Sequence, residues 1–160
     1  MLIRVYNRSD AAAITQLFYE TVHCVNRQDY SELQVQAWAP TVPDPQLWHM
    51  RMSERCTLVA EEGEQIIAFA ELERDGHLDM FYCRKDVIRR GVGLALYRAV
   101  ELKAISLGLE RIFADVSITA RPFFERCGFS TLCHQTGRRA GIELSNFKME
   151  KWLAAPAPRR

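Results

Sequence analysis

Apolar and polar positions change their spacing along the chain, and this change separates strands from helices. Alternating or continuous apolar runs bounded by turn residues are typical of strands, whereas apolar positions three and four residues apart are typical of one helix face. Strands are therefore predicted at Leu2–Val5, 56–60, Gln65–Leu72, 77–83, 111–116, 131–136 and 142–149. Glycine-containing turns join several of them, at 62–64, 75–76 and 137–141.

Helical spacing fills the segments between these strands. Ser9 or Asp10 is expected to cap a first helix, and Ser31 a second. Pro45 suits the first turn of a third, short helix, because proline at this position gives up an N–H that has no partner there. The apolar face of the first helix is predicted to carry Ala13, Leu17, Phe18 and Val22.

Two more helices are predicted in the second half, a long one over 93–107 and a short one over 119–128, ended by Gly108 and Gly128. The element order predicts an α/β fold of the mixed α+β kind, with a mostly antiparallel mixed sheet of six to seven strands flanked by helices. Residues 1–153 are expected to form a single domain, and 154–160 a flexible C-terminal tail.

Composition narrows the functional classes. The 160 residues are 48% hydrophobic and 26% charged, which suffices for one core, and the net charge of +1 does not favour nucleic acid or a membrane surface as partner. No run is long enough to predict a membrane span or a signal peptide. The five cysteines are odd in number and lack a Cys-x-x-Cys pair, so reduced thiols in a cytoplasm are expected rather than a zinc site or disulfides. A homodimer is compatible with the sequence.

The stretch 77–94 has the pattern of an anion site. An apolar strand leads through a charged turn into Arg89, Arg90, Gly91 and Gly93, and then into the long helix. The first turn of a helix presents unpaired N–H groups and positive dipole, and glycine lets a phosphate approach the backbone. A Walker loop would end in Gly-Lys-Ser/Thr, and a dinucleotide fingerprint would have a small residue in place of Leu96. A glycine-containing helix start without a ligand is the remaining alternative.

Residues 88–93, Ile-Arg-Arg-Gly-Val-Gly, resemble a third type of loop, the pyrophosphate loop Gln/Arg-x-x-Gly-x-Gly/Ala of the GNAT superfamily of N-acetyltransferases. Only the first position, Ile88, departs from it. A second stretch resembles the family signature Asn-x-x-Ala-x-x-Phe-Tyr-x-x-x-Gly-Phe, through Ser117, Ala120, Phe123, Phe124, Gly128 and Phe129. The resemblance covers the chain from about residue 64 to the end, and the chain is identified as a member of a branch of small, poorly characterised bacterial acetyltransferases.

This resemblance implies an enzyme that moves an acetyl group from acetyl-CoA to a primary amine of a small molecule or protein, without a metal. It also implies that the strands 77–83 and 111–116 splay apart and hold the pantetheine arm between them. The cofactor-binding residues expected from it are Phe81, Tyr82, Cys83, Arg89, Arg90, Gly91, Val92, Gly93, Leu94, Ser117, Phe123 and Phe124. The acceptor site is expected between the first helices and the 137–141 turn, near His23, Arg27, Tyr30 and Trp38.

Two groups are candidates for the base that takes the proton of the amine. His77 and Asp79 stand two apart on the central strand, so they are predicted to share a face with Phe81 and Cys83 and to act as a coupled pair. Their alternative is an exposed strand end. Glu71 and Glu73 are second candidates, and a solvated strand end is the favoured interpretation of both.

The family commonly has a tyrosine that acts as a general acid where this chain has Phe124, and phenylalanine donates no proton. The departing thiolate would then be protonated by Tyr30, Tyr82 or water, or would leave as a stabilised anion. The same departure motivates an alternative function, a non-catalytic acyl-CoA-binding regulatory module.

Overall fold

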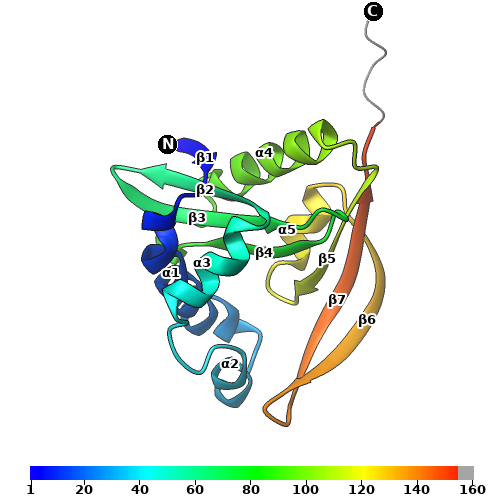
Figure 1. Ribbon diagram of the computed structural model, residues 1–160. Helices are drawn as coiled ribbons and strands as arrows, with labels where there is room; N and C mark the ends of the chain where they lie inside the picture. The colour runs from blue at the N-terminus through cyan, green and yellow to red at the C-terminus, as the bar shows by residue number, and fades with distance from the viewer. Residues whose placement is uncertain (155–160) are drawn as a thin grey trace, which may run out of the picture.

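Two antiparallel sheets form the framework of the computed structural model, which describes residues 1–154 (Figure 1). The predicted tail lies outside these residues, except for Ala154. The four-stranded sheet has the order β1 (Leu2–Val5), β2 (Cys56–Glu62), β3 (Gln65–Leu72), β4 (Leu78–Cys83). The three-stranded sheet has the order β5 (Arg111–Ser117), β7 (Ile142–Trp152), β6 (Ser130–Arg139). The seven strands agree with the predicted mixed fold.

Helices cover the four-stranded sheet on both faces and so create two apolar cores. The first core lies under α4 (Val92–Ser106) and α5 (Arg121–Arg126) and includes Ala68 and Ala70 of β3. The second lies under α1 (Ala11–Cys24), α2 (Glu32–Trp38) and α3 (Pro45–Ser53) and includes Phe69 of the same strand. Alternate β3 residues thus face opposite cores, as the two-residue period of a strand requires.

The N-terminal half differs from the prediction at its first helix. Asn7, rather than Ser9 or Asp10, makes the side-chain cap, and it opens a 3₁₀ turn at Arg8–Asp10 that leads into α1. Asp10 instead ion-pairs with Arg4 at 2.8 Å. Ala13 is exposed, because the buried stripe of α1 begins at Ala11 and continues through Ile14, Leu17, Phe18, Thr21 and Val22. The predicted cap at Ser31 is confirmed, since its side chain accepts from the Gln34 N–H.

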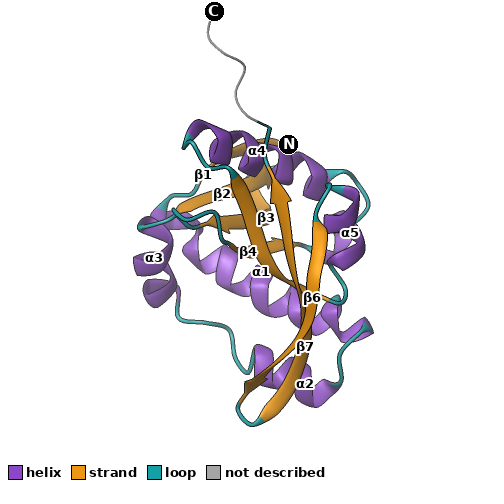
Figure 2. Cartoon of the chain, turned by 90° about the vertical axis from the view of Figure 1, so that its right-hand side faces the viewer, coloured by secondary structure: helices purple, strands orange, loops and turns teal. Residues whose placement is uncertain are grey.

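The last hairpin is longer than predicted. β6 and β7 stay paired up to Arg139 and Ile142, so the turn shrinks from 137–141 to Ala140 and Gly141. Both turn residues have positive φ angles, 48° and 77°, as the two-residue turn of a tight hairpin requires. The end of β6, residues 136–139, is exposed on both faces, so it lacks the apolar alternation that would have predicted its length. Figure 2 shows it beside α2, where Gln34 donates to the Glu143 carbonyl at 2.9 Å.

The two sheets meet where β4 and β5 begin. His77 and Phe113 form a single parallel bridge, and the Phe113 N–H donates to the Gly76 carbonyl at 3.1 Å. Gly76 has a φ of 97°, and a Cβ on it would lie 2.3 Å from the Arg111 carbonyl oxygen, so only glycine permits this approach. Beyond the bridge, within the described residues, β4 pairs with β3 and β5 with β7. We call this divergence the β4–β5 splay.

The helices of the structure can be compared with the length that a membrane span needs. Among residues 1–154, no helix combines the length and the apolar character that crossing a bilayer requires.

Candidate active site

Backbone groups that do not pair with β3 line the β4 side of the splay, and one of them, the Cys83 carbonyl, accepts from the Thr21 hydroxyl at 3.1 Å. The Arg84 N–H donates to the Ile67 carbonyl of β3 at 2.8 Å, and peptide directions alternate along a strand. The peptide groups of Phe81 and Cys83 therefore face away from β3, toward the splay. Tyr82 faces β3, and its ring packs on Phe69 in the second core. Of the three predicted β4 residues, Phe81 and Cys83 have the backbone orientation that a ligand in the splay would need.

The helix that follows β4 starts without a side-chain cap. Gly91, with a φ of 81°, is the N-cap of α4, and no side-chain hydrogen bond closes this end. The first intrahelical bond runs from the Ala95 N–H to the Gly91 carbonyl at 3.1 Å, so the N–H groups of 92–94 have no intrahelical acceptor and remain available to an anion. The Arg90 N–H is excluded from this set, because it donates to the Val87 carbonyl at 3.2 Å.

The start of α4 lies directly against the end of β4 and against α5. A Cβ on Gly93 would lie 3.3 Å from the Phe123 ring and 3.6 Å from the Cys83 sulfur. The free N–H groups thus open beside the end of the β4 edge. Arg89 is exposed and has a left-handed φ of 65°, and the exposed Arg90 lies 3.5 Å from Glu62. Two cations at this helix start add to its attraction for phosphate.

The residues of the second family signature lie across the splay, at the end of β5. The Ser117 hydroxyl accepts from the Ala120 N–H at 3.1 Å and from the Asn26 amide at 3.4 Å, which leaves its proton free to donate. Phe123 stacks on Phe81 with ring centroids 5.4 Å apart. These two aromatic rings join β4 to α5 on the α4 side of the sheet.

Phe124 belongs to the apolar core behind this contact. Its side chain is 3% exposed and meets the rings of Phe81 and Phe129 edge-on. The structure therefore gives the position a packing role in the first core.

The other candidate proton donors are weak acids. The Tyr30 hydroxyl donates to the Ser145 carbonyl at 2.6 Å and accepts from the Ile118 N–H at 3.0 Å, so both functions are used within the fold. Burial raises the pKa of Tyr30 and that of Tyr82. Burial also raises the pKa of the Cys83 thiol, to about 12. Cys83 is therefore a neutral thiol at physiological pH.

The expected acceptor cluster is largely structural. The His23 ring nitrogen Nε2 lies 2.7 Å from the Ala39 carbonyl, and Trp38 packs edge-on against Tyr30. Arg27 is exposed and lies 3.9 Å from Glu32. These contacts tie the first helices together, so a helix-pair core with polar residues at its rim describes these residues better than an acceptor site does.

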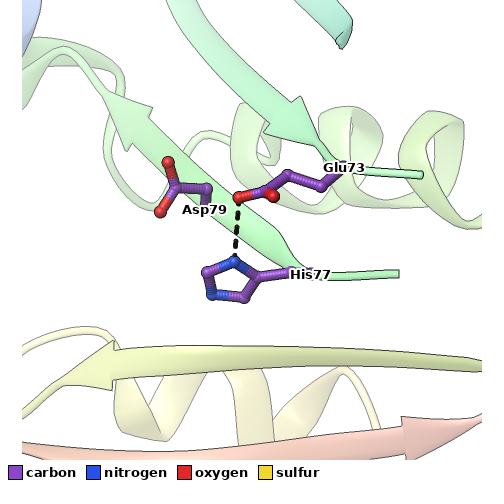
Figure 3. Close-up of side chains that lie close together, drawn as sticks. All are labelled: Glu73, His77 and Asp79. Carbon is purple, nitrogen blue, oxygen red and sulfur yellow. Dashed lines mark hydrogen bonds and ion pairs between the residues drawn. The ribbon is translucent and has the colours of Figure 1, made fainter. Parts of the chain in front are cut away.

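His77 stands at the closed end of the splay (Figure 3). Its Nδ1 lies 3.0 Å from the Glu73 carboxylate, its Nε2 lies 4.0 Å from Asp115, and its ring stacks on Phe113. Asp79 instead pairs with Arg55 at 2.9 Å. The predicted coupling between His77 and Asp79 is thus wrong in its partner, since the carboxylate bonded to the imidazole is Glu73.

The predicted common face with Phe81 and Cys83 is also wrong, and a β-bulge is the reason. Leu72 pairs with Leu78 but Glu71 pairs with Met80, which leaves Asp79 as the extra residue. A bulge breaks the alternation of side chains. Phe81 and Cys83 pack in the first core, whereas Asp79 turns toward Arg55 on the side of α3.

Glu71 was expected at a solvated strand end, but its side chain is fully buried. Its carboxylate ion-pairs with Arg55 and, at 3.2 Å, with Arg51 of α3. Burial raises the pKa of Glu71, and the two guanidinium groups oppose this by favouring the charged form. A carboxylate held by two arginines is a poor candidate for a base, so Glu71 is a structural residue.

Glu73, His77 and Asp79 each bring one potential metal-ligand atom within 4.8 Å of the others. Arg55 already contacts both carboxylates, Glu73 at 3.3 Å and Asp79 at 2.9 Å. The guanidinium supplies the positive charge that this group of acids needs, so the cluster is an ion-pair network.

Comparison with known proteins decides the family. The pattern of the family described as "Acetyltransferase (GNAT) domain" matches residues 26–151. The chain belongs to the GNAT acetyltransferase family. The predicted family, fold and enzyme class are thereby confirmed, and the protein is an acyltransferase of the acetyl-CoA-dependent class. The matched range contains both signature stretches and the whole β4–β5 splay.

Two relatives are similar to this acetyltransferase over almost their full length. The protein named "Uncharacterized N-acetyltransferase YafP" of Escherichia coli K12 is 32% identical over 147 residues, which cover 92% of this chain and 93% of that protein. A crystal structure from Rhodopseudomonas palustris, described as a GCN5-related N-acetyltransferase (Aminotransferase, Class-II), is also 32% identical, with a TM-score of 0.89 and 95% of each chain covered.

A more distant structure shows the same fold. The phosphinothricin acetyltransferase of Sinorhizobium meliloti, solved in complex with acetyl-CoA, has a TM-score of 0.76 at 18% identity, covering 99% of this chain and 91% of that one. The GNAT architecture is thus retained at low sequence identity.

Sequence reasoning missed three features of the site in this acetyltransferase. Arg55 gave no signal, because an arginine before a strand is ordinary. Asp115 could have been noticed, since it is a charged residue inside the apolar run of β5. The pairing of Glu73 with His77 depends on the β3–β4 hairpin and its bulge, which the sequence pattern does not reveal.

Proposed function

We propose that this acetyltransferase binds acetyl-CoA with its pantetheine arm in the β4–β5 splay and its pyrophosphate on the N–H groups of 92–94. The observation that supports the proposal is the continuity of donors. The outward peptide edge of β4 ends beside the uncapped start of α4. An extended amide chain matches the first part, and a pyrophosphate matches the second. Arg89 and Arg90 add charge at the rim, and the Ser117 hydroxyl donates across the splay.

The acetyl group would then lie along the β4 edge, with its carbonyl facing the N–H groups of Phe81 or Cys83. Such donors stabilise the oxyanion that forms when an amine attacks the thioester carbon. A C–N bond forms, the C–S bond breaks, and its electron pair leaves on the sulfur of coenzyme A. The attacking nitrogen must lose a proton, and we assign this proton to His77, the imidazole at the closed end of the splay.

A tyrosine hydroxyl is not the proposed acid for the thiolate. Phe124 occupies the family position, Tyr30 has both hydrogen-bonding functions engaged, and the Tyr82 ring packs on Phe69 in the second core. We therefore propose that the thiolate takes its proton from water or leaves as an anion beside the start of α4. The Cys83 thiol takes no covalent part, because burial keeps it protonated.

The acceptor is proposed to be a primary amine of a small molecule or protein that reaches the splay from the face carrying His77. The location is proposed to be the cytoplasm. The five cysteines support this, since all are unpaired in the structure.

The decisive experiment combines binding with turnover. Calorimetry should show acetyl-CoA binding, and a panel of mono- and polyamines, amino acids and peptides should reveal release of free thiol from acetyl-CoA. His77→Gln should lower kcat by about 10²–10⁴ while leaving the Kd of acetyl-CoA unchanged, since the cofactor is held by backbone groups. Binding without turnover across the panel would favour the non-catalytic acyl-CoA module, for which Phe124 is the motive. Absence of binding would refute the proposed function.

A further inference from the structure

Arg55 occupies the centre of the charged network beside His77. It lies just before β2, and its guanidinium reaches three carboxylates from two other strands and their hairpin. It ion-pairs with Glu71, with Glu73 at 3.3 Å and with Asp79 at 2.9 Å. A single cation thus contacts three of the carboxylates that β3, β4 and their hairpin bring near the imidazole.

The position of Arg55 is fixed from beneath by Glu71. That carboxylate is fully buried and shared with Arg51 of α3. A buried charge must keep its partners, because losing one leaves an uncompensated ion in a medium of low dielectric. Arg55 therefore cannot leave the network at low cost, and its outward N–H groups are presented in one direction.

This arrangement divides the two carboxylates near His77 into different roles. Asp79 is bonded to Arg55, whereas Glu73 lies between Arg55 and the imidazole, 3.0 Å from Nδ1. A carboxylate only accepts hydrogen bonds, so Nδ1 carries the proton of this contact and Nε2 keeps the lone pair. The nitrogen with the lone pair is directed toward β5, where Asp115 lies 4.0 Å away.

From this geometry we infer that Arg55 is a positioning residue for the acetyl transfer, which draws Asp79 away from His77 and sets Glu73 against its Nδ1. The inference rests on the proposed role of His77. Removing the cation would free Asp79 to approach the imidazole and would leave the charge of Glu73 beside Nδ1 uncompensated, and both changes would favour the protonated, inactive form of His77. Arg55 thus opposes protonation of the base.

Other charged groups also face His77 and stay constant in the test. Asp115 on β5 accepts from Gln135 at 2.6 Å and lies opposite Lys148 of β7. Asp75 accepts from the backbone N–H of His77, and Arg111 lies over the Phe113 ring on which His77 stacks. A hollow of about 590 Å³ borders Arg55 and Glu73 on their outer side, so solvent screens the network there.

The test uses charge-neutral substitutions. Arg55→Gln alone leaves Glu71 with one partner and endangers folding, so the double variant Arg55→Gln/Glu71→Gln removes both charges together. Glu73→Gln keeps an acceptor for Nδ1 but removes the charge, and Asp79→Asn is the matched variant at the other carboxylate. Each is measured by the pH dependence of kcat/KM, by the Kd of acetyl-CoA, and by NMR titration of the His77 ring, which needs no turnover.

The three variants should move the acidic limb of the pH profile in different ways. In the double variant the pH midpoint of the acidic limb should rise by about 0.5–1 pH unit, because nearby carboxylates stabilise the imidazolium more strongly. In Glu73→Gln the midpoint should fall by a similar amount, because one of these carboxylates is lost. Asp79→Asn should move it less than Glu73→Gln. The Kd of acetyl-CoA should stay within about twofold, because the cofactor contacts lie on backbone groups.

Two results would overturn the inference: an unchanged limb in the double variant, or a shift in Asp79→Asn as large as that in Glu73→Gln. If the NMR titration of the ring moves as expected while the pH profile does not, Arg55 has no part in the reaction and His77 is not the base. That result would refute the residue assignment and leave the proposed cofactor site standing.

Discussion

The start of α4 allows a sharp test of the cofactor site, through the substitution Gly91→Glu. Gly91 has a φ of 81°, and a Cβ there would meet nothing within 4 Å. The substitution therefore adds backbone strain of roughly 1–2 kcal/mol without a clash. The new carboxylate lies at the N-terminus of the helix, where its interaction with the helix dipole stabilises the folded protein by about 0.3–1 kcal/mol. We expect a folded protein with a modest loss of stability.

The effect on binding should be larger than the effect on stability. A carboxylate about 4 Å from a phosphate repels it by about 1 kcal/mol in bulk water and by about 4 kcal/mol at the effective dielectric constant of a protein surface. One decade in Kd corresponds to about 1.4 kcal/mol, so acetyl-CoA should bind about 5-fold to 1,000-fold more weakly. The weakening should shrink at high salt, because ions screen exposed charges.

Gly108, at the other end of α4, supplies the matched control. Its φ is 75°, and a Cβ there also meets nothing within 4 Å. Gly108→Glu thus adds the same side chain with the same strain, but at the C-terminus of the helix. Isothermal calorimetry with acetyl-CoA should give a wild-type Kd for Gly108→Glu, a Kd no higher than the wild-type value for Gly91→Lys, because its charge attracts the phosphate, and a raised Kd for Gly91→Glu. Equal affinities of the two glutamate variants would remove this helix start as the pyrophosphate site.

Three other outcomes are expected. Phe124→Tyr should leave kcat within a few-fold but lower the free energy of unfolding by about 1–3 kcal/mol, because its hydroxyl would be buried among aromatic rings; a much larger fall in kcat would contradict the packing role. Cys83→Ala should retain transfer, and intact-protein mass spectrometry of wild type with acetyl-CoA alone should show no acetyl-enzyme; a mass gain of one acetyl group on Cys83 would refute the direct attack. Although burial opposes its ionisation, hydrogen bonds from Arg4 and Asn7 hold the pKa of Asp10 below 3.8. Its stabilisation is therefore present above that pH and lost as the pH falls further, so urea unfolding of Asp10→Asn should show lower stability at neutral pH and a smaller loss near pH 3; parallel curves would contradict this.

The sequence predicted the elements well where one face of each is buried. The strands from Cys56 to Cys83 and the long helix α4 carry continuous or periodic apolar positions, so their order was readable and the splay followed from the family resemblance. The β6 strand was predicted too short, because its end, residues 136–139, carries no apolar side chain on either face. The spacing of apolar residues therefore did not predict the strand where neither of its faces is buried.

The site could be predicted only in its backbone part. The glycines and arginines of 89–93 carry their meaning in local sequence, since a helix start is a local structure. The side-chain partners of His77 depend on a bulge that redirects Asp79 and on a hairpin that returns Glu73 to the imidazole. Such contacts are set by register, and a shift of one residue changes every neighbour.

The single bridge at His77 and Phe113 has a mechanical consequence. Among the described residues, a single bridge joins the backbones of the two sheets, so a small rotation of one sheet against the other would pivot about this bridge. Such a rotation would displace the strands least at the His77–Phe113 bridge and progressively more along β4 toward α4. Gly76, which admits no side chain, holds the pivot closed. His77 thus lies where such a rotation would move the strands least, and the opening would be widest beside the start of α4, where a bulky nucleotide would have to enter and leave.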